Sequence, residues 1–537
     1  MIKNRQNNHR VLNSVNRLFL LLLTIALFTA CSGQEDEKVV LSSEAYIENF
    51  SFKNQFNSDL DEDIKARVRG TKIEVSVPYK VSIEELIPSF TFVGAKIEVN
   101  NVEQQSDVTK SNFTQTVIYR ITAENGDVKE YTVTVTKNPP RIPRVYINTE
   151  NNFEFQDKDK EKYVKSTVRI EDPDNYYSTV TDFTGNGEIK GRGNSTWTAP
   201  KRPYRIKLND KARLLGMSND KNWALLANYF DKTLLRNITA FELSRIADMN
   251  WTPKSLSVDY YMNDTYRGVY TLTEHVRVSD ERLDFDLVSD DEVVGDYLLE
   301  LDFHYDEPSK FKTNMEQLPI LFKDPDMPNS AQFNYVKDFF NTAESVLYSS
   351  NFKDPINGYR KYLDVESFIK YYIVHEIAKN VDGNFRGSCH MALRENGKIE
   401  LPMIWDFDIA FGNADHITWE QGASSREWDG WYIKTQSPWF DQLFKDPAFV
   451  AEVKTMWNEL KPQLDEVPEY VRAQAKLINE AQIRNFSPKP QGAGWSVTER
   501  TWNTSFVRGS YQAELNYLVY FIEKRIEWLH TNINNLD

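Results

Sequence analysis

The sequence predicts an α+β fold, with a strand-rich front and a helical back, behind a small immunoglobulin-like β-sandwich. Between residues 46 and 137, apolar and polar residues alternate in one short stretch after another, which is typical of strands. Residues 145–330 mix strands with one clear helix at 231–247, and residues 331–537 are mostly helical apart from a strand-rich stretch around 388–412. With 537 residues and 40% hydrophobic residues, the chain is long enough for several domains.

Residues 1–30 are predicted to be a lipoprotein signal peptide. Four basic residues precede an apolar run from Leu18 to Phe28, which is shorter than a membrane-spanning helix. The run ends in "LFTAC" and resembles a bacterial lipoprotein signal, in which Cys31 would carry the lipid. The acidic "SGQEDE" that follows resembles the signal that exports lipoproteins of the Bacteroidetes to the cell surface. We therefore expect an outer-membrane lipoprotein at the cell surface, attached to the membrane through its lipid alone. An ordinary cleaved signal peptide is the alternative.

Three further segments precede the main body of the chain. Residues 31–45 are a polar tether, and residues 46–137 form the predicted β-sandwich, with Asn125-Gly126 as a hairpin turn. This β-sandwich resembles the N-terminal β-domains of Bacteroidetes surface lipoproteins, and we expect it to act as a spacer or a binding module. Residues 138–144 lie in the proline-rich "TKNPPRIPR" and form a stiff linker.

Charge and cysteine content exclude several classes of function. The net charge of −15 argues against nucleic acid as a partner, because phosphate binding requires clustered lysine and arginine. Once Cys31 is lipidated, Cys389 is the remaining cysteine, so neither a disulfide framework nor a cysteine zinc cluster can form. Cys389 could be a nucleophile, but no histidine or acid is arranged around it in the sequence. The seven histidines show no metal-ligand spacing.

The stretch "MIWDFDIAFGNAD" (403–415) carries Asp406 and Asp408 inside an otherwise apolar and aromatic run. If 403–409 is a strand, the two side chains point to the same face, about 7 Å apart. Two carboxylates this close repel each other unless a cation or a shared proton lies between them. Carboxylates of this kind suit magnesium, which also takes ligands from substrate phosphates. A buried ion-pair network with an arginine is the alternative.

The residues before this stretch predict a catalytic loop. A helix over 364–379, capped by its first residue, ends just before Asp382, which lies in the following loop. Two short strands around 388–394 and 398–405 then form a hairpin that leads to Asp406. Helix, loop aspartate, hairpin and metal aspartate follow one another in this order in the catalytic half of protein kinases, where the loop aspartate accepts the proton of the substrate hydroxyl.

The stretch "GEIKGRGNSTWTAPKRPYRIKLN" (187–209) can hold phosphate. A strand within it places Arg205 and Lys207 on one side, as a phosphate-binding lysine requires. Glycine-rich turns and strand lysines are also common in proteins of other functions. The turn whose backbone can approach phosphate oxygens consists of Gly191, Gly193, Asn194 and Ser195.

Taken together, several segments resemble the CotH kinase family of atypical protein kinases: "GRGNSTW…PKRPYRIKL", "KNWALLANYFDKTLLRN", "YRGVYTLTEHV", "NVDG" and "IWDFDIAFGN". The resemblance runs from about residue 145 to the C-terminus. It implies a protein-kinase-like two-lobed domain over 145–537, with an N-lobe of about 145–300 and a helical C-lobe of about 301–537. It also implies ATP with Mg²⁺ or Mn²⁺ as cofactors and protein serine or threonine as the substrate.

The resemblance also implies roles for individual residues. Asp382 matches the catalytic aspartate, Asp406 and Asp408 the metal aspartates, and Lys207 the phosphate-binding lysine. Glu274 follows a strand where a kinase has its hinge, and would line the nucleotide pocket. The remaining predicted phosphate contacts are Arg192, Gly193, Asn194 and Ser195.

Three assignments stay open at this point. The acidic partner of the lysine is Glu242 or Glu274. A second metal contact comes from Asn384 or Asn413, because Gly387 stands where a kinase has asparagine. Two arginines, Arg192 and Arg236, bind phosphate or are structural.

The sequence therefore predicts a surface-anchored kinase of extracytoplasmic proteins. A non-catalytic adhesin or scaffold is the main alternative, and its glycan contacts would come from the aromatic cluster Trp428, Trp431, Trp439 and Phe440. A glycoside hydrolase that uses Asp406 and Asp408 is a third possibility, although its acids usually face each other across a cleft.

Overall fold

The computed structural model describes residues 40–177, 182–414, 428–501 and 507–537. The chain divides into two units. The first comprises residues up to 57, 62–75 and 83–135, and the second comprises residues 58–61, 76–82 and 136–537. The predicted lipidation site Cys31 and its flanking segments lie outside the described residues. No helix in the described ranges is both long and apolar enough to span a membrane.

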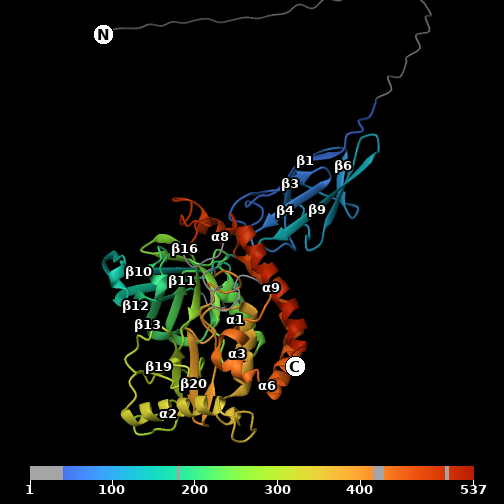
Figure 1. Ribbon diagram of the computed structural model, residues 1–537. Coiled ribbons are helices and arrows are strands. Elements are labelled where there is room, and N and C mark those ends of the chain that lie inside the picture. The colour runs from blue at the N-terminus through green and yellow to red at the C-terminus, as the bar shows by residue number, and fades with distance from the viewer. Residues whose placement is uncertain (1–39, 178–181, 415–427, 502–506) are drawn as a thin grey trace, which may run out of the picture. The chain divides into compact units, whose positions relative to one another are not determined.

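The first unit is a β-domain of two sheets, as the alternating pattern predicts (Figure 1). Every second residue of β4 is buried, and the turn at Asn125-Gly126 joins the antiparallel strands β8 and β9. One sheet has the order β2 (Ile64–Lys65), β1 (Tyr46–Phe52), β5 (Pro88–Val93). The other has the order β3 (Arg67–Arg69), β4 (Lys72–Val77), β9 (Val128–Lys137), β8 (Val117–Thr122), β6 (Lys96–Val99), β7 (Val102–Glu103).

The second unit begins with a closed seven-stranded barrel, which the sequence did not predict. Its strands are antiparallel neighbours except for β10 and β15, which close the barrel as a parallel pair. Val145 and Val168 are among the apolar side chains of its buried core. In order around the barrel the strands are β10 (Arg144–Thr149), β11 (Val164–Glu171), β12 (Phe183–Gly191), β13 (Tyr204–Arg213), β14 (Asn219–Leu226), β16 (Thr265–Glu274) and β15 (Ser255–Met262).

A second sheet of five strands follows the barrel in the chain. It combines strands that precede helix α2 (Ser330–Leu347) with the predicted hairpin β20–β21, whose second strand is shorter than expected. The order is β18 (Lys310–Lys312), β19 (Pro319–Asp324), β17 (Tyr297–Leu301), β20 (Cys389–Arg394), β21 (Lys398–Glu400). The mixture of helices and sheets is as predicted, but a division into two kinase-like lobes is not confirmed.

Helices make up most of the chain after residue 330. The helix predicted at 364–379 is present, and the Asp364 carboxylate caps it by accepting a hydrogen bond of 2.9 Å from the Ser367 amide. The helix predicted at 231–247 begins later, at Arg236. The helices are α1 (Arg236–Ile246), α2 (Ser330–Leu347), α3 (Val365–Ala378), α4 (Ile433–Gln436), α5 (Pro438–Leu443), α6 (Pro447–Leu464), α7 (Val467–Leu477), α8 (Asn479–Phe486) and α9 (Tyr511–Asn534).

The stretch 403–409 is not a strand, contrary to the prediction. Strand β21 ends at Glu400, and Asp406 has a φ of +63°, which no extended strand allows. Of the aromatic residues considered for glycan binding, Trp439 and Phe440 are fully buried in the core of this unit. They therefore stabilise the fold and cannot contact a glycan.

Candidate functional site

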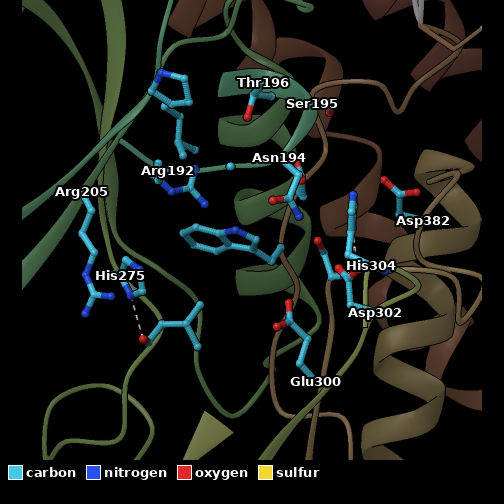
Figure 2. A pocket seen from close by; sticks show the side chains of 18 of the residues that line it. Arg192, Asn194, Ser195, Thr196, Arg205, His275, Glu300, Asp302, His304 and Asp382 are labelled. Atoms are coloured by element: carbon cyan, nitrogen blue, oxygen red, sulfur yellow. Dashed lines mark hydrogen bonds and ion pairs between the residues drawn. The ribbon is translucent and has the colours of Figure 1, made fainter. Parts of the chain in front are cut away.

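A cavity of about 800 Å³ lies within the second unit (Figure 2). One wall is formed by the loop after β12 and by residues of β13 and β14, and the other by β17, β19 and the loops that carry Asp382 and Asp406. Its lining combines apolar side chains, among them Leu298 and Phe322, with neutral polar and charged side chains. A volume of this size suits a small-molecule ligand such as a nucleotide.

The glycine-rich turn lies on the barrel side of the cavity, and both glycines are required by close contacts. Gly193 has a φ of +78°, and a Cβ atom there would lie 2.0 Å from Oγ1 of Thr196. A Cβ atom at Gly191 would lie 2.4 Å from the ring of Trp197. The exposed side chains of Asn194 and Ser195 therefore stand at the cavity on a tightly packed turn.

Arg192 reaches into the cavity from the same turn (Figure 2). Its guanidinium carbon lies 5.6 Å from the ring centre of Trp405. Burial lowers the pKa of Arg192, and the charges of Asp406 and Asp408 oppose this effect. The arginine thus supplies positive charge opposite the two aspartates.

Asp406 and Asp408 both line the cavity, and a loop, not the predicted strand, brings them together. Burial raises the pKa of Asp406, which is hydrogen-bonded to Asp408. Burial, followed by the charge of Asp406, raises the pKa of Asp408 well above its ordinary value. The two carboxyl groups are therefore held in contact at a site where two negative charges are unfavourable.

Side chains from three segments fix the loop that carries these aspartates. The Asn237 side chain accepts a hydrogen bond of 2.9 Å from the Phe407 amide, and the Asn380 amide donates one of 3.1 Å to the Asp406 carbonyl. Asn413 donates to the Asp408 carbonyl at 2.7 Å, and Nε of Arg236 donates to the Ala410 carbonyl at 3.1 Å. These bonds satisfy buried backbone groups. They give Asn413 and Arg236 structural roles.

Asp382 lines the cavity from the loop between α3 and β20. Burial and the neighbouring charge of Asp406 raise the pKa of Asp382 to about 7, and Arg386 opposes the shift. A hydrogen bond fixes this loop to helix α3: the Tyr371 hydroxyl donates to the Gly383 carbonyl at 3.1 Å. A carboxyl group with a pKa near neutrality is suited to general base catalysis.

Two residues predicted to bind the nucleotide do not line the cavity. Lys207 is exposed, two residues further along β13 than Arg205, which does line it. Two residues correspond to about 7 Å along a strand. Lys207 is on the same face of β13 as Arg205, but it lies beyond the end of the cavity. Glu274 is buried, and its carboxylate accepts hydrogen bonds from the backbone amides of Ser218 and Lys254 at 2.8 and 3.0 Å.

Neither candidate acid pairs with Lys207. Glu242 instead forms an ion pair with Arg245 on α1. Lysine–glutamate pairs that do line the cavity include Lys323 with Glu300, whose Nζ and Oε2 are 3.1 Å apart, and Lys190 with Glu161. Lys207 therefore brings no positive charge to the cavity, whose lining cations include Arg192, Arg205, Lys323 and Arg386.

Sequence reasoning also missed acidic residues that follow β17. Asp302 accepts hydrogen bonds from the Ser388 amide at 3.0 Å and from the His304 amide at 2.8 Å, which joins its segment to the loop of Asp382. Figure 2 shows Asp302 and His304 on the same side of the cavity as Asp382. Polar residues directly after the apolar strand "YLLEL" were the signal that could have identified them.

The donor set fits magnesium in the presence of phosphate. Within the described ranges, no three side chains of His, Cys, Asp or Glu are grouped so that they could hold a metal by themselves. Magnesium often binds through one or two carboxylates and takes its remaining ligands from phosphate and water. Asp406 and Asp408 match this requirement, and a cation would relieve their mutual repulsion. Asn384 also lines no part of the cavity, so neither asparagine is placed as a second contact.

Cys389 is not a nucleophile in this fold. Its thiol is buried, and burial raises the pKa of Cys389 to about 12. The thiol lies within hydrogen-bonding distance of the Tyr371 hydroxyl, at 3.1 Å. Only the thiolate reacts, so a thiol with this pKa is inert at neutral pH.

Comparison with known proteins identifies the family. Residues 47–135 match the model of the family described as SGBP, N-terminal. No curated protein matches the chain. One solved structure, of a protein from Bacteroides thetaiotaomicron described as a glycoside hydrolase, is 16% identical, with a TM-score of 0.15. The match covers 30% of this chain and 52% of that one, so the chain spans about half the length of that protein. Residues 189–529 match the model of the family described as CotH kinase protein. The chain belongs to the CotH kinase protein family.

Proposed function

We propose that the chain is a magnesium-dependent protein kinase that transfers the γ-phosphate of ATP to serine or threonine hydroxyls. The supporting observation is that Asp382, Asp406 and Asp408 share one cavity with the glycine-rich turn and Arg192. Catalysis of phosphoryl transfer rests on positioning and electrostatic stabilisation. A base, a pair of metal-binding carboxylates and a turn that can approach phosphate are the parts that such a reaction needs.

Each part has a role in the proposed reaction. Asp382 accepts the proton of the acceptor hydroxyl. Asp406 and Asp408 would hold magnesium, which neutralises phosphate charge when bound. Arg192 and the turn at Gly193 hold the phosphates, and the apolar part of the cavity near Phe322 takes the base of the nucleotide.

Replacement of Asp382 tests this proposal directly. Asp382→Asn keeps the size of the side chain and removes its charge, so phosphotransfer should fall at least ~100-fold, as expected for the loss of a general base. The rise in melting temperature on binding ATP should be retained. Asp248→Asn, which changes a side chain that is 96% exposed, is the matched control. A wild-type rate in Asp382→Asn would show that Asp382 is not the base.

A non-catalytic surface protein that binds glycans is the second candidate, and the match of residues 47–135 to the SGBP N-terminal family favours it. ATP binding separates the two candidates. If the purified wild-type chain binds no nucleotide in the presence of magnesium, the kinase proposal fails and the binding function takes its place.

Both candidates place the protein at the cell surface through a lipid on Cys31. Cys31→Ser should therefore release the protein from membranes. A Cys31→Ser protein that stays with the membrane fraction would contradict this anchor.

A further inference from the structure

The loop that carries Asp382 also carries an arginine one turn later. Arg386 lines the cavity, and its backbone amide donates a hydrogen bond of 3.1 Å to the Asp382 carbonyl. The Arg386 carbonyl accepts a bond of 3.0 Å from the Phe303 amide. The backbone of Arg386 is thus fixed relative to Asp382, and its side chain alone is free to adjust.

The guanidinium of Arg386 is close to Asp382 but is not hydrogen-bonded to it. Nη1 lies 3.8 Å from Oδ1 of Asp382, which is a charge contact and too long for a hydrogen bond. Its central carbon lies 4.9 Å from the ring centre of Phe303, and the side chain is 43% exposed. No hydrogen bond joins this guanidinium to another described residue, so its donors are available to a ligand.

Other cations that line the cavity either form ion pairs or hydrogen bonds with protein side chains or lie on the barrel side. Lys323 pairs with Glu300 and Glu307. Arg205 donates a hydrogen bond of 3.0 Å to the Asn222 side chain. Arg192 belongs to the glycine-rich turn on the barrel wall. Arg386 is therefore the cation placed beside the predicted base.

We propose that Arg386 is a further catalytic residue, which contacts the phosphoryl group during its transfer. This inference rests on the proposed kinase function. The acceptor oxygen forms a bond to the γ-phosphorus, the bond from that phosphorus to the β–γ bridging oxygen breaks, and its electron pair leaves with ADP. The proton of the acceptor passes to Asp382. Because Asp406 and Asp302 already bring negative charge close to Asp382, the charge of the phosphoryl oxygens needs a cation on the Asp382 side, and Arg386 provides it.

Three variants of the chain test this inference in a phosphotransfer assay with ATP and magnesium. Arg386→Gln should lower kcat ~1,000-fold or more, as the loss of a transition-state arginine does, while KM for ATP changes little. Arg386→Lys should recover little of the rate, because an ammonium group lacks the paired donors of a guanidinium. Arg386→Ala should regain activity when guanidinium ion is added at millimolar concentration. Arg245→Gln, on the exposed face of α1, is the matched control.

The possible outcomes separate this inference from the function on which it rests. A melting temperature measured for each variant identifies any that do not fold, and rescue of Arg386→Ala by guanidinium requires a folded protein. If the wild type transfers phosphate and Arg386→Gln does so at a similar rate, Arg386 has no catalytic role and the kinase proposal stands. A folded Arg386→Ala protein that guanidinium does not rescue would also overturn the inference. If the wild type transfers no phosphate, the kinase function itself is wrong.

Discussion

Gly383 lies directly against the imidazole ring of His375, so closely that a Cβ atom at position 383 would lie 1.8 Å from Nδ1. The ring is buried, and burial lowers the pKa of His375 to about 3, so it is neutral. It stacks on Tyr371, with the ring centres 3.9 Å apart, and cannot move away easily. The position of the residue after Asp382 is thus set by a side chain of α3.

Gly383→Ala should displace the loop of Asp382 and lower phosphotransfer by ~100-fold, because a shift of about 1 Å at a catalytic group can have an effect of this size. Kinetic measurement of kcat checks the expectation. The double variant His375→Ala, Gly383→Ala restores space for the added methyl group and should recover part of the rate. If the single variant is fully active, the contact does not position the loop.

The ion pair of Asp231 and Arg236 has both side chains fully buried. Arg236→Ala should lower the free energy of unfolding by about 3–5 kcal/mol, because it leaves the Asp231 carboxylate buried without its partner. Urea denaturation measures the change. Arg236→Ala combined with Asp231→Ala should be less destabilised than the single variant. A change below about 1 kcal/mol for Arg236→Ala would contradict this view of the pair.

Asp382 should make the fold less stable at alkaline pH. Its folded pKa of about 7 exceeds the unfolded value of about 3.9, so the folded chain binds this proton more tightly. Acidification from pH 8 to pH 5 therefore favours the folded state at this group. Asp382→Asn removes the buried charge and should stabilise the protein at pH 8, by up to about 4 kcal/mol, with a smaller gain at pH 5. Thermal unfolding in the presence of a chelator tests the effect, and an equal gain at both pH values would contradict it.

Asp406→Ala should weaken magnesium-dependent binding of ATP, and Asp408→Ala should weaken it less. Removal of either carboxylate takes away a ligand that magnesium would use beside the phosphates. Titration calorimetry with magnesium and with a chelator measures both affinities. If the wild type binds ATP equally well with magnesium and with the chelator, Asp406 and Asp408 do not hold a metal that assists ATP binding.

Local sequence patterns predicted the elements whose formation depends on residues close together in the sequence. Asp364 caps the helix before the loop of Asp382, and the hairpin of β20 and β21 followed from its turn. Asp382 and Asp406 line one cavity, and their roles as base and metal ligand stay predictions. The left-handed backbone of Asp406 could not be predicted, because hydrogen bonds from distant segments hold it.

The roles predicted for two other residues depended on distances along a strand. Alternation correctly placed Arg205 and Lys207 on one face, but it could not say where the cavity ends along that face. Glu274 follows a strand as expected, and its orientation is decided by the amides of Ser218 and Lys254, which belong to other segments. Positions such as these require the tertiary structure.

The closed barrel also imposes an order on folding. The barrel is closed by the pairing of β10 with β15, in which Val145 lies opposite Tyr260. Strand β10 therefore has no partner on one side until the chain as far as β15 is available. Contacts between residues so distant in the chain form slowly, because the intervening loop must first be closed. A nascent or truncated chain that stops before residue 255 would expose unpaired strand edges, which promote association between chains. Such fragments should aggregate, whereas the finished barrel leaves no such edge.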